Sequence, residues 1–312
     1  MKIAIIDLGT NTFHLLIAEI NSDYSYSIIH QENESVQLGK GGISINEIQT
    51  EAMERGFSTL KKFMEIIQNA KINKAIAIGT SALRNAKNGI QFTDKVEKEI
   101  GIKIEIVTGD QEAELIFLGV NEAINISELK ALTMDIGGGS VEFIISQKNK
   151  ILWKKSFEIG VARLINNYSF SKELEKKESI LLNDFLKTEL KELIEILKIY
   201  PCKILIGSAG SFETFAAMCE NNIGKNSFST PSYLFDIKEL NKVLQLLEKS
   251  TLAERRINAS IIPLRVEMIV PAAIITKLIL QMLVPQEVYL STFALKEGVL
   301  VNFINQIKNN QA

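Results

Sequence analysis

The feature that most constrains the fold of this chain is an internal repeat with an offset of 128 residues. The segment Ile6–Thr12 reads IDLGTNT and returns as MDIGGGS at Met134–Ser140. A second pair, IGTSA at Ile78–Ala82 and IGSAG at Ile206–Gly210, has the same offset. Two separate motifs that recur at one spacing indicate a chain built from two similar halves.

Each half begins with three short apolar runs that are separated by turns. In the first half these runs are Lys2–Asp7, His14–Ile20 and Tyr26–His30, and the second half repeats the pattern from Leu132 onward. Segments with helical spacing follow, and then a further apolar run. Strands that alternate with helices predict an α/β fold in which helices pack against a sheet.

The repeat predicts two domains, and a length of 312 residues suits that number at roughly 100–200 residues per domain. We expect the first domain over residues 1–124 and the second over residues 125–295, with the junction near 122–130. A C-terminal helix at 296–312 is a candidate addition to the first domain.

Three apolar stretches predict helices. Ile45–Asn69 and Lys172–Lys198 carry Leu, Ile and Phe at spacings of three and four. The most apolar stretch, Met268–Val284, contains Pro271 and Lys277 and is shorter than the roughly 20 apolar residues of a membrane span. We therefore expect a buried helix there and no membrane association.

Composition excludes several functional classes. A net charge of −2 gives no overall basic field for a nucleic-acid polymer. Two cysteines and two histidines are too few for a disulfide framework or a Cys/His zinc site, so a metal would sit on oxygen ligands, as magnesium does. Free thiols and the lack of a signal-peptide pattern predict a cytoplasmic protein.

The two glycine turns are the first candidates for chemistry. Asp7 ends the first apolar run, and the turn that follows contains Thr10, Asn11 and Thr12. A strand-end aspartate can hold a hydrated cation, and turn amides and hydroxyls can bind phosphate oxygens. The alternative interpretation is an ordinary hairpin turn with a capping aspartate.

The second turn is richer in glycine. Asp135 precedes Gly137, Gly138 and Gly139, and Ser140 and Glu142 follow. Consecutive glycines allow backbone N–H groups to approach an anion closely. Because side chains two positions apart on a strand point to the same face, Ser140 and Glu142 are expected to face the same way.

Two further motifs supply charged side chains. Arg84 follows a strand end, where a guanidinium could neutralise a phosphoryl group, although a surface ion pair is the alternative. Glu112 lies in the first turn of a predicted helix, in the segment Thr108–Leu115. It could act as a general base, or the segment could be a capping box between Thr108 and Gln111 with acids that favour the helix dipole.

Taken together, these motifs resemble the exopolyphosphatase/guanosine pentaphosphate phosphatase (Ppx/GppA) family. The resemblance rests on IDLGTNTFH at Ile6–His14, GTSALR at Gly79–Arg84, Glu112-Ala113, and DIGGGSVE at Asp135–Glu142, with a fainter match at Glu297-Gly298. It implies two ribonuclease-H-like domains of the actin-like ATPase superfamily around a central cleft. It also implies Mg²⁺-assisted hydrolysis of a terminal phosphoanhydride in polyphosphate or guanosine pentaphosphate.

The resemblance also implies roles for individual residues. Glu112, Arg84 and Glu142 would be catalytic, and Asp135 and Asp7 would hold the metal. The phosphate-binding residues would be Thr10, Asn11, Thr12, Gly137, Gly138, Gly139, Ser140 and Gly210. We further expect a homodimer.

The sequence departs from the family pattern in three places. Glu114 stands where arginine is frequent, and Gly210-Ser211-Phe212 replaces a Gly-Gly-Thr loop. The helical region related to HD-type domains in longer members has no counterpart here, so a long channel for processive digestion is not expected. Two alternative functions stay open. One is an actin-superfamily kinase that uses ATP, because a fold does not fix a function. The other, left open by the departures at Glu114 and Gly210-Ser211-Phe212, is a guanosine tetraphosphate-binding regulatory module with little turnover.

Overall fold

The structure is a computed structural model that describes residues 1–125, 128–220 and 230–310. The chain divides into two compact units. Unit 1 comprises Met1–Gly119, Gly137–Gly139 and Leu295–Ala312, and unit 2 comprises Val120–Ile136 and Ser140–Ala294. The junction expected near residues 122–130 includes 126–127, which lie outside the described residues.

Unit 1 is built on a five-stranded sheet of order β3-β2-β1-β4-β5. The strands are β1 (Lys2–Leu8), β2 (Thr12–Ile20), β3 (Tyr26–Ser35), β4 (Ala75–Gly79) and β5 (Ile104–Ile106). The helical elements are η1 (Ile43–Ile45), α1 (Thr50–Asn69), α2 (Ser81–Asn85), α3 (Gly89–Ile100), α4 (Gly109–Ala123) and α12 (Leu295–Asn309). β1 pairs antiparallel with β2 and parallel with β4, so it lies at the centre of the sheet.

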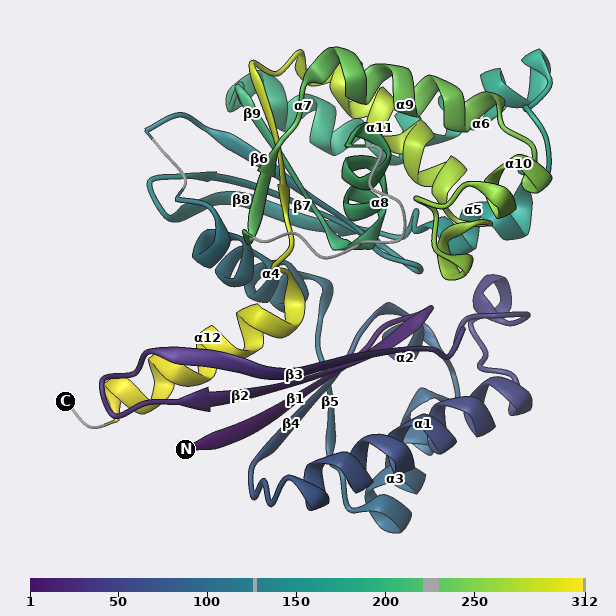
Figure 1. Ribbon diagram of the computed structural model, residues 1–312. Coiled ribbons are helices and arrows are strands. Elements are labelled where there is room, and N and C mark those ends of the chain that lie inside the picture. The colour runs from purple at the N-terminus through teal and green to yellow at the C-terminus, as the bar shows by residue number, and fades with distance from the viewer. Residues whose placement is uncertain (126–127, 221–229, 311–312) are drawn as a thin grey trace. The chain divides into compact units, whose positions relative to one another are not determined.

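Both faces of this sheet are covered, which explains why β1 is apolar along almost its whole length. Ala4, Ile6 and Leu8 belong to one core with side chains of α1 and α3, whereas Ile3 and Ile5 are buried on the opposite face. Figure 1 shows α1 and α3 along one side of the sheet and α12 along the other. Helix α12 therefore covers strands that precede it by almost the whole chain.

Unit 2 repeats this plan with one more strand, in the order β10-β11-β9-β6-β7-β8. The strands are β6 (Ala131–Ile136), β7 (Val141–Gln147), β8 (Lys150–Phe157), β9 (Ile204–Ser208), β10 (Ser232–Leu234) and β11 (Glu287–Ser291). The helical elements are α5 (Val161–Asn167), α6 (Lys176–Glu189), α7 (Lys191–Ile199), α8 (Ala209–Cys219), α9 (Ile237–Lys249), α10 (Leu252–Ile257), η2 (Pro263–Arg265) and α11 (Ile269–Leu283).

The two sheets have the same topology. In each unit an antiparallel three-strand meander is extended by parallel strands, β4 and β5 beside β1, and β9 and β11 beside β6. The expected α/β fold with duplicated ribonuclease-H-like domains is therefore confirmed.

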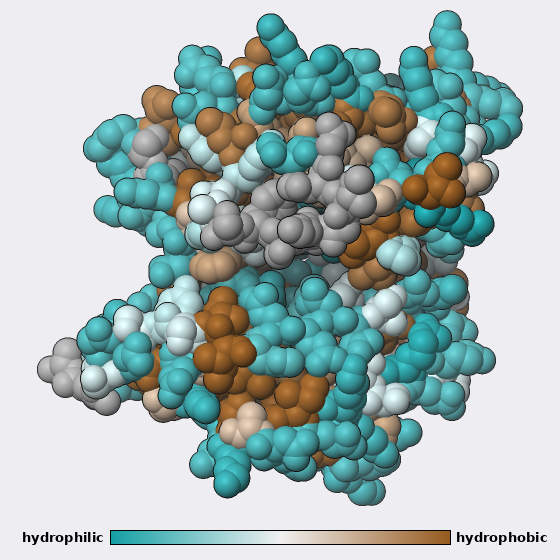
Figure 2. Space-filling view, viewed as in Figure 1, coloured by the Kyte–Doolittle hydropathy of each residue, from teal (hydrophilic) through white to brown (hydrophobic). Residues whose placement is uncertain are grey.

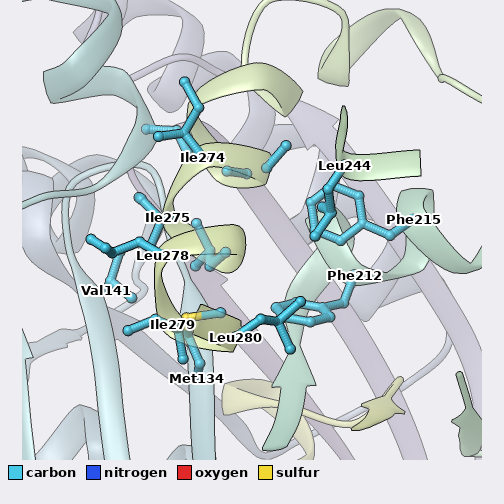
Figure 3. Close-up of a cluster of buried hydrophobic side chains, with 14 of the residues drawn as sticks. Met134, Val141, Phe212, Phe215, Leu244, Ile274, Ile275, Leu278, Ile279 and Leu280 are labelled. Carbon is cyan, nitrogen blue, oxygen red and sulfur yellow. The ribbon is translucent and has the colours of Figure 1, made fainter. Parts of the chain in front are cut away.

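Helix α11 forms the centre of the core of unit 2. Ile275 and Ile279 are fully buried, and Figure 3 shows α11 packed beside Phe212 and Phe215 of α8 and Met134 of β6. A helix that is apolar all round is expected to be buried in this way. None of the helices in the described part of the chain combines the length and the hydropathy that crossing a bilayer requires.

Two of the expected helices are wrong in their extent. The stretch Lys172–Lys198 forms α6 and α7, because Leu190 leaves helical geometry at φ −85° and ψ 11° while its side chain stays in the core. The stretch Ile45–Asn69 begins as η1 and resumes as α1 only at Thr50, because the preceding residue is extended. Propensity and spacing continue through both breaks, so the pattern alone did not reveal them.

The face drawn in Figure 2 is mainly hydrophilic, with polar side chains over most of it and separate apolar patches. Exposed large apolar side chains such as Ile90, Leu246 and Ile257 belong to different elements. Isolated apolar residues of this kind are common on protein surfaces.

Candidate active site

The β1–β2 turn of unit 1 is a compact, hydrogen-bonded loop. The Gly9 amide donates to the Thr12 carbonyl at 3.1 Å, and a Cβ on Gly9 would lie 2.8 Å from that carbonyl oxygen. Thr10 and Thr12 are buried. The Asn11 carbonyl accepts hydrogen bonds from two amides of the loop after β3, at 3.1 and 2.8 Å. The conformation of the turn is thus fixed by hydrogen bonds between backbone groups.

Arg84 and Glu112 form an ion pair within unit 1. The Arg84 Nη1 group donates to Glu112 Oε2 at 2.6 Å and to the Val107 carbonyl at 3.2 Å. The side chains are only 16% and 8% exposed. Because removing one partner of a pair this buried leaves an uncompensated charge, each side chain is strongly dependent on the other.

The first turn of α4 positions Glu112. Thr108 and Gln111 form the expected capping box, with the Thr108 amide donating to Gln111 Oε1 at 2.8 Å and the Gln111 amide donating to Thr108 Oγ1 at 3.2 Å. The capping-box interpretation of this segment is confirmed, and the role of Glu112 as a general base stays a prediction. The cap fixes the start of the helix. Glu112, the residue after Gln111, directs its buried carboxylate to Arg84.

The glycine turn between β6 and β7 belongs to unit 1 by its contacts, although its strands belong to unit 2. A Cβ on Gly138 would lie 2.5 Å from Asn11 Nδ2, and one on Gly139 would lie 2.4 Å from Ser81 Oγ. Side chains have no room at either position. Glycine is required here because the backbone approaches these polar side chains closely.

In unit 2, four oxygen-bearing side chains form a row across neighbouring strands. Asp135 is paired with Glu142 of β7 and with Ser208 of β9, and Glu142 is paired with Ser156 of β8. The Ser208 hydroxyl donates to Asp135 Oδ2 at 2.6 Å, and the Ser156 hydroxyl donates to Glu142 Oε1 at 2.6 Å. The two carboxylates are buried at 7% and 1% exposure, and the hydroxyls orient them.

Gly210 lies in the first turn of α8 in unit 2, and α8 begins directly after β9. A Cβ on Gly210 would lie 1.8 Å from Arg265 Nη2, so glycine leaves the space that this guanidinium occupies. Ala209, just before it, has φ 67°, which is a strained conformation for a residue with a side chain. Burial lowers the pKa of the Arg265 guanidinium, and the nearby Glu213 and Asp135 carboxylates oppose that effect.

Arg255 supports the segment that carries Arg265. Its guanidinium is 1% exposed and donates to the carbonyls of Val266 at 2.8 Å and Ser250 at 2.7 Å, and also to that of Phe170. Three backbone segments are thereby joined by one side chain. The position of Arg265 therefore depends on Arg255.

The structure brings the expected residues together in two groups. Unit 1 holds Thr10, Asn11, Arg84, Glu112 and the three glycines, and unit 2 holds Asp135 and Glu142. Ser140, 2% exposed, directly follows the three glycines and belongs to unit 2. Gly210, also in unit 2, lies against Arg265, which interacts electrostatically with Asp135.

Two residues of the carboxylate row were not predicted. Ser208 has a signal in the sequence, because the 128-residue offset equates it with Thr80. For Ser156 the only sequence signal is its position on the third strand of the meander. The only sequence signal for Arg265 is its position before an apolar helix.

The halves differ at one paired position that bears on metal binding. The repeat equates His14 with Glu142, and in unit 1 His14 is the strand partner of Asp7, with its Nδ1 atom 2.7 Å from Asn33 Oδ1. Only the second half therefore pairs two carboxylates.

A hard divalent cation fits the donor set of unit 2. Within the described ranges, no group of three or more His, Cys, Asp and Glu side chains is arranged around a metal position. Asp135 and Glu142 supply two carboxylates, and magnesium commonly takes its remaining ligands from water and substrate phosphates.

The comparison with known families decides the assignment. The model of the Ppx/GppA phosphatase family matches residues 16–306, which is most of the chain. The chain belongs to the Ppx/GppA phosphatase family. The resemblance expected from the motifs is confirmed, and so is the expected hydrolase class at the level of the family.

Relatives of this Ppx/GppA member include solved and curated proteins. The crystal structure of an exopolyphosphatase from Cytophaga hutchinsonii is 38% identical, with a TM-score of 0.93 and 98% of each chain covered. A Ppx/GppA enzyme from Aquifex aeolicus is 25% identical, with a TM-score of 0.82, and the match covers 97% of this chain and 99% of that one.

Two curated relatives are longer. A bifunctional 3-dehydroquinate synthase/phosphatase from Fusobacterium nucleatum is 33% identical over 89% of this chain. A guanosine-5′-triphosphate,3′-diphosphate pyrophosphatase from Pseudoalteromonas translucida is 29% identical over 98% of this chain. The chain spans 43% and 60% of their respective lengths. Membership of a phosphatase family favours a hydrolase over the ATP-dependent kinase and the regulatory module.

Proposed function

We propose that this Ppx/GppA member hydrolyses the terminal phosphoanhydride of inorganic polyphosphate or the 5′ phosphate of guanosine pentaphosphate. The observation that carries the proposal is the buried pair of Arg84 and Glu112, which places a phosphate-binding cation and a basic carboxylate 2.6 Å apart. The exopolyphosphatase from Cytophaga hutchinsonii, at 38% identity, makes polyphosphate the first substrate to test.

In the proposed reaction the terminal phosphate takes the place of Glu112 as a partner of Arg84. The Glu112 carboxylate then accepts a proton from a water molecule, whose oxygen forms the new bond to phosphorus. The anhydride P–O bond breaks on the opposite side, and the shortened chain leaves with the electron pair. Arg84 neutralises the charge on the transferring group.

The remaining residues bind and orient. Thr10, Asn11, Thr12 and the amides of Gly137, Gly138 and Gly139 hold phosphate oxygens. Asp135 and Asp7 would hold magnesium, Glu142 would act as a further catalytic acid, and Ser208 and Ser156 would fix the Asp135 and Glu142 carboxylates. Bound magnesium supplies positive charge to the phosphates. Ser140 and Gly210 complete the phosphate-binding set.

The decisive experiment is a phosphate-release assay with Glu112→Gln. We expect this variant to lose at least about 100-fold in turnover, because it lacks the base. It also leaves Arg84 without its counter-charge and so lowers stability, and circular dichroism checks that the variant is folded under the assay conditions. Asp110→Asn is the matched control, since Asp110 is an exposed acid in the same helical turn. The assay compares polyphosphates of several lengths with guanosine pentaphosphate, with and without magnesium.

Turnover of Glu112→Gln equal to that of the control would contradict the role of Glu112. A wild-type protein that releases no phosphate from either substrate, but transfers phosphate from ATP to an acceptor, would point to the kinase. Tight binding of guanosine tetraphosphate without any turnover would point to the regulatory module.

A further inference from the structure

An arginine of α1 holds the loop that follows β3 in unit 1. The Arg55 guanidinium donates to the carbonyls of Val36 at 2.8 Å and Gln37 at 3.1 Å. It also donates to the Glu51 carbonyl of its own helix at 3.1 Å. These three acceptors are backbone groups, and the fork of donors in a guanidinium can bond two neighbouring carbonyls at once. Arg55 therefore joins the loop to α1.

The same stretch of the loop is bonded to the β1–β2 turn. The Val36 and Gln37 amides donate to the Asn11 carbonyl at 3.1 and 2.8 Å. The peptide group between Val36 and Gln37 is therefore bonded at both ends, because its C=O accepts from Arg55 and its N–H donates to Asn11. Hydrogen bonds in such a chain polarise one another. Arg55 is thus connected to the turn through a single peptide group.

The loop depends on this support because Gln37 has a φ of 50°. The left-handed conformation is unfavourable for a residue with a side chain, and it persists where the surrounding contacts enforce it. The Gln37 carbonyl accepts from Arg55 and from the Lys40 amide, the latter at 3.0 Å. The Gly39 amide in turn donates to the Thr10 carbonyl at 3.1 Å. Loss of Arg55 should therefore loosen the amides that bond the turn.

The rest of the loop is fixed without Arg55. Asn88 Oδ1 accepts from the Ile48 amide at 2.9 Å, and Asn88 Nδ2 donates to the Ile48 carbonyl at 2.9 Å. The side chains of Val36 and Leu38 are fully buried in the core of unit 1. Replacement of Arg55 should therefore change the backbone of residues 36–39 and leave unit 1 folded.

We propose that Arg55 is a positioning residue for phosphate binding, because it holds the loop that sets the backbone of Thr10 and Asn11. This inference rests on the proposed function, in which Thr10 and Asn11 bind phosphate oxygens. Arg55 acts through the loop rather than on the substrate. Contacts with phosphates that do not react have equal strength in the ground state and the transition state, so weakening them raises KM and leaves kcat unchanged.

Arg55→Ala tests the inference through the kinetics of phosphate release from polyphosphate and guanosine pentaphosphate. We expect KM to rise about tenfold while kcat stays within about twofold of the wild type. Arg55→Lys keeps the charge but lacks the planar fork that reaches two carbonyls, so its KM should lie between those of Arg55→Ala and the wild type.

Lys62→Ala is the matched control. Lys62 is a cation seven positions further along α1, so it lies on the same side of the helix as Arg55. Its partners are the exposed or half-buried carboxylates Glu32 and Glu34 of β3, which precede the loop. This variant should keep the KM of the wild type.

Hydrogen exchange gives a second readout that does not depend on turnover. In Arg55→Ala the amides of Val36, Gln37 and Gly39 should exchange at least about tenfold faster than in the wild type, because their hydrogen bonds open more often. Lys62→Ala should leave these rates unchanged. If Arg55→Ala does not fold, Arg55→Lys is compared with the wild type in both measurements.

Three results would overturn the inference: an unchanged KM in Arg55→Ala, an equal rise of KM in Lys62→Ala, or a loss confined to kcat. In each case the wild type hydrolyses its substrate, so the proposed function stands. A wild-type protein that releases no phosphate from either substrate would overturn the proposed function and this inference with it.

Discussion

The Ser208 hydroxyl donates a hydrogen bond of 2.6 Å to Asp135, although the two residues lie 73 positions apart and on neighbouring parallel strands. Both side chains are buried. The bond therefore fixes one rotamer of a carboxylate that we propose as a magnesium ligand. Ser208 acts through Asp135 rather than on the substrate.

Ser208→Ala should raise the magnesium concentration that half-maximal phosphate release requires, by about tenfold, because outer partners orient metal ligands. It should also cost about 1–3 kcal/mol of stability through the lost charge-assisted bond. Ser146→Ala is the control. Ser146 is equally buried in the same sheet, and its hydroxyl has no hydrogen-bond partner among the described residues. An unchanged magnesium requirement in Ser208→Ala would contradict the orienting role.

Arg84→Ala should destabilise the protein by about 3–5 kcal/mol, because it leaves the Glu112 carboxylate buried without its cation. Urea unfolding measures the loss. The pair of Arg163 and Glu158 offers a comparison, since its side chains are 19% and 41% exposed. Arg163→Ala should cost less than Arg84→Ala, because the Glu158 carboxylate that it leaves behind is partly solvated. Equal losses in the two variants would show that the Arg84 pair is effectively solvated.

Arg255→Met should lower stability by several kcal/mol, since the carbonyls of three backbone segments lose a donor while buried. The neighbouring Arg256 is exposed, and Arg256→Met should be nearly neutral. Thermal unfolding followed by circular dichroism compares the two. A melting temperature for Arg255→Met equal to that of the control would show that the three segments hold together without it.

Cys202 and Cys219 should resist alkylation in the folded protein. Burial raises the pKa of each thiol to about 12, so neither is deprotonated at pH 8. The unfolded thiols deprotonate near pH 9, so the folded state holds more protons between about pH 9 and 12 and stability falls as pH rises through that window. Iodoacetamide labelling with and without urea, read by mass spectrometry, checks this. Rapid labelling of the native protein at pH 8 would contradict it.

The sequence predicted the duplicated fold because two motifs share one offset, and it located both glycine turns. It did not predict the pairing of Ser208 with Asp135. In the first half Gly79 pairs with Leu8, whereas in the second half Gly207 pairs with Met134, two residues earlier in the repeat. The register between parallel strands depends on how the connecting helices pack. The spacing of a sequence repeat carries no information on that packing.

The contact of α12 with α4 and the hydrogen bonds of Arg255 could not be predicted from the sequence either. Gly298 has only a faint motif match, and glycine is needed there because a Cβ would lie against the backbone of α4 at Gly119, 179 positions earlier. Nothing in the sequence around Arg255 marks it as buried. A buried arginine whose partners are carbonyl groups leaves no pattern in the sequence, because every residue has a carbonyl.

The late position of α12 has a consequence for how the protein is made. The residues of α12 leave the ribosome only after the whole of unit 2. Until then, the face of the first sheet that carries Ile3 and Ile5 lacks its covering helix. At typical rates of translation that interval lasts roughly ten seconds or more. The nascent chain thus presents an open hydrophobic surface until α12 has been synthesised.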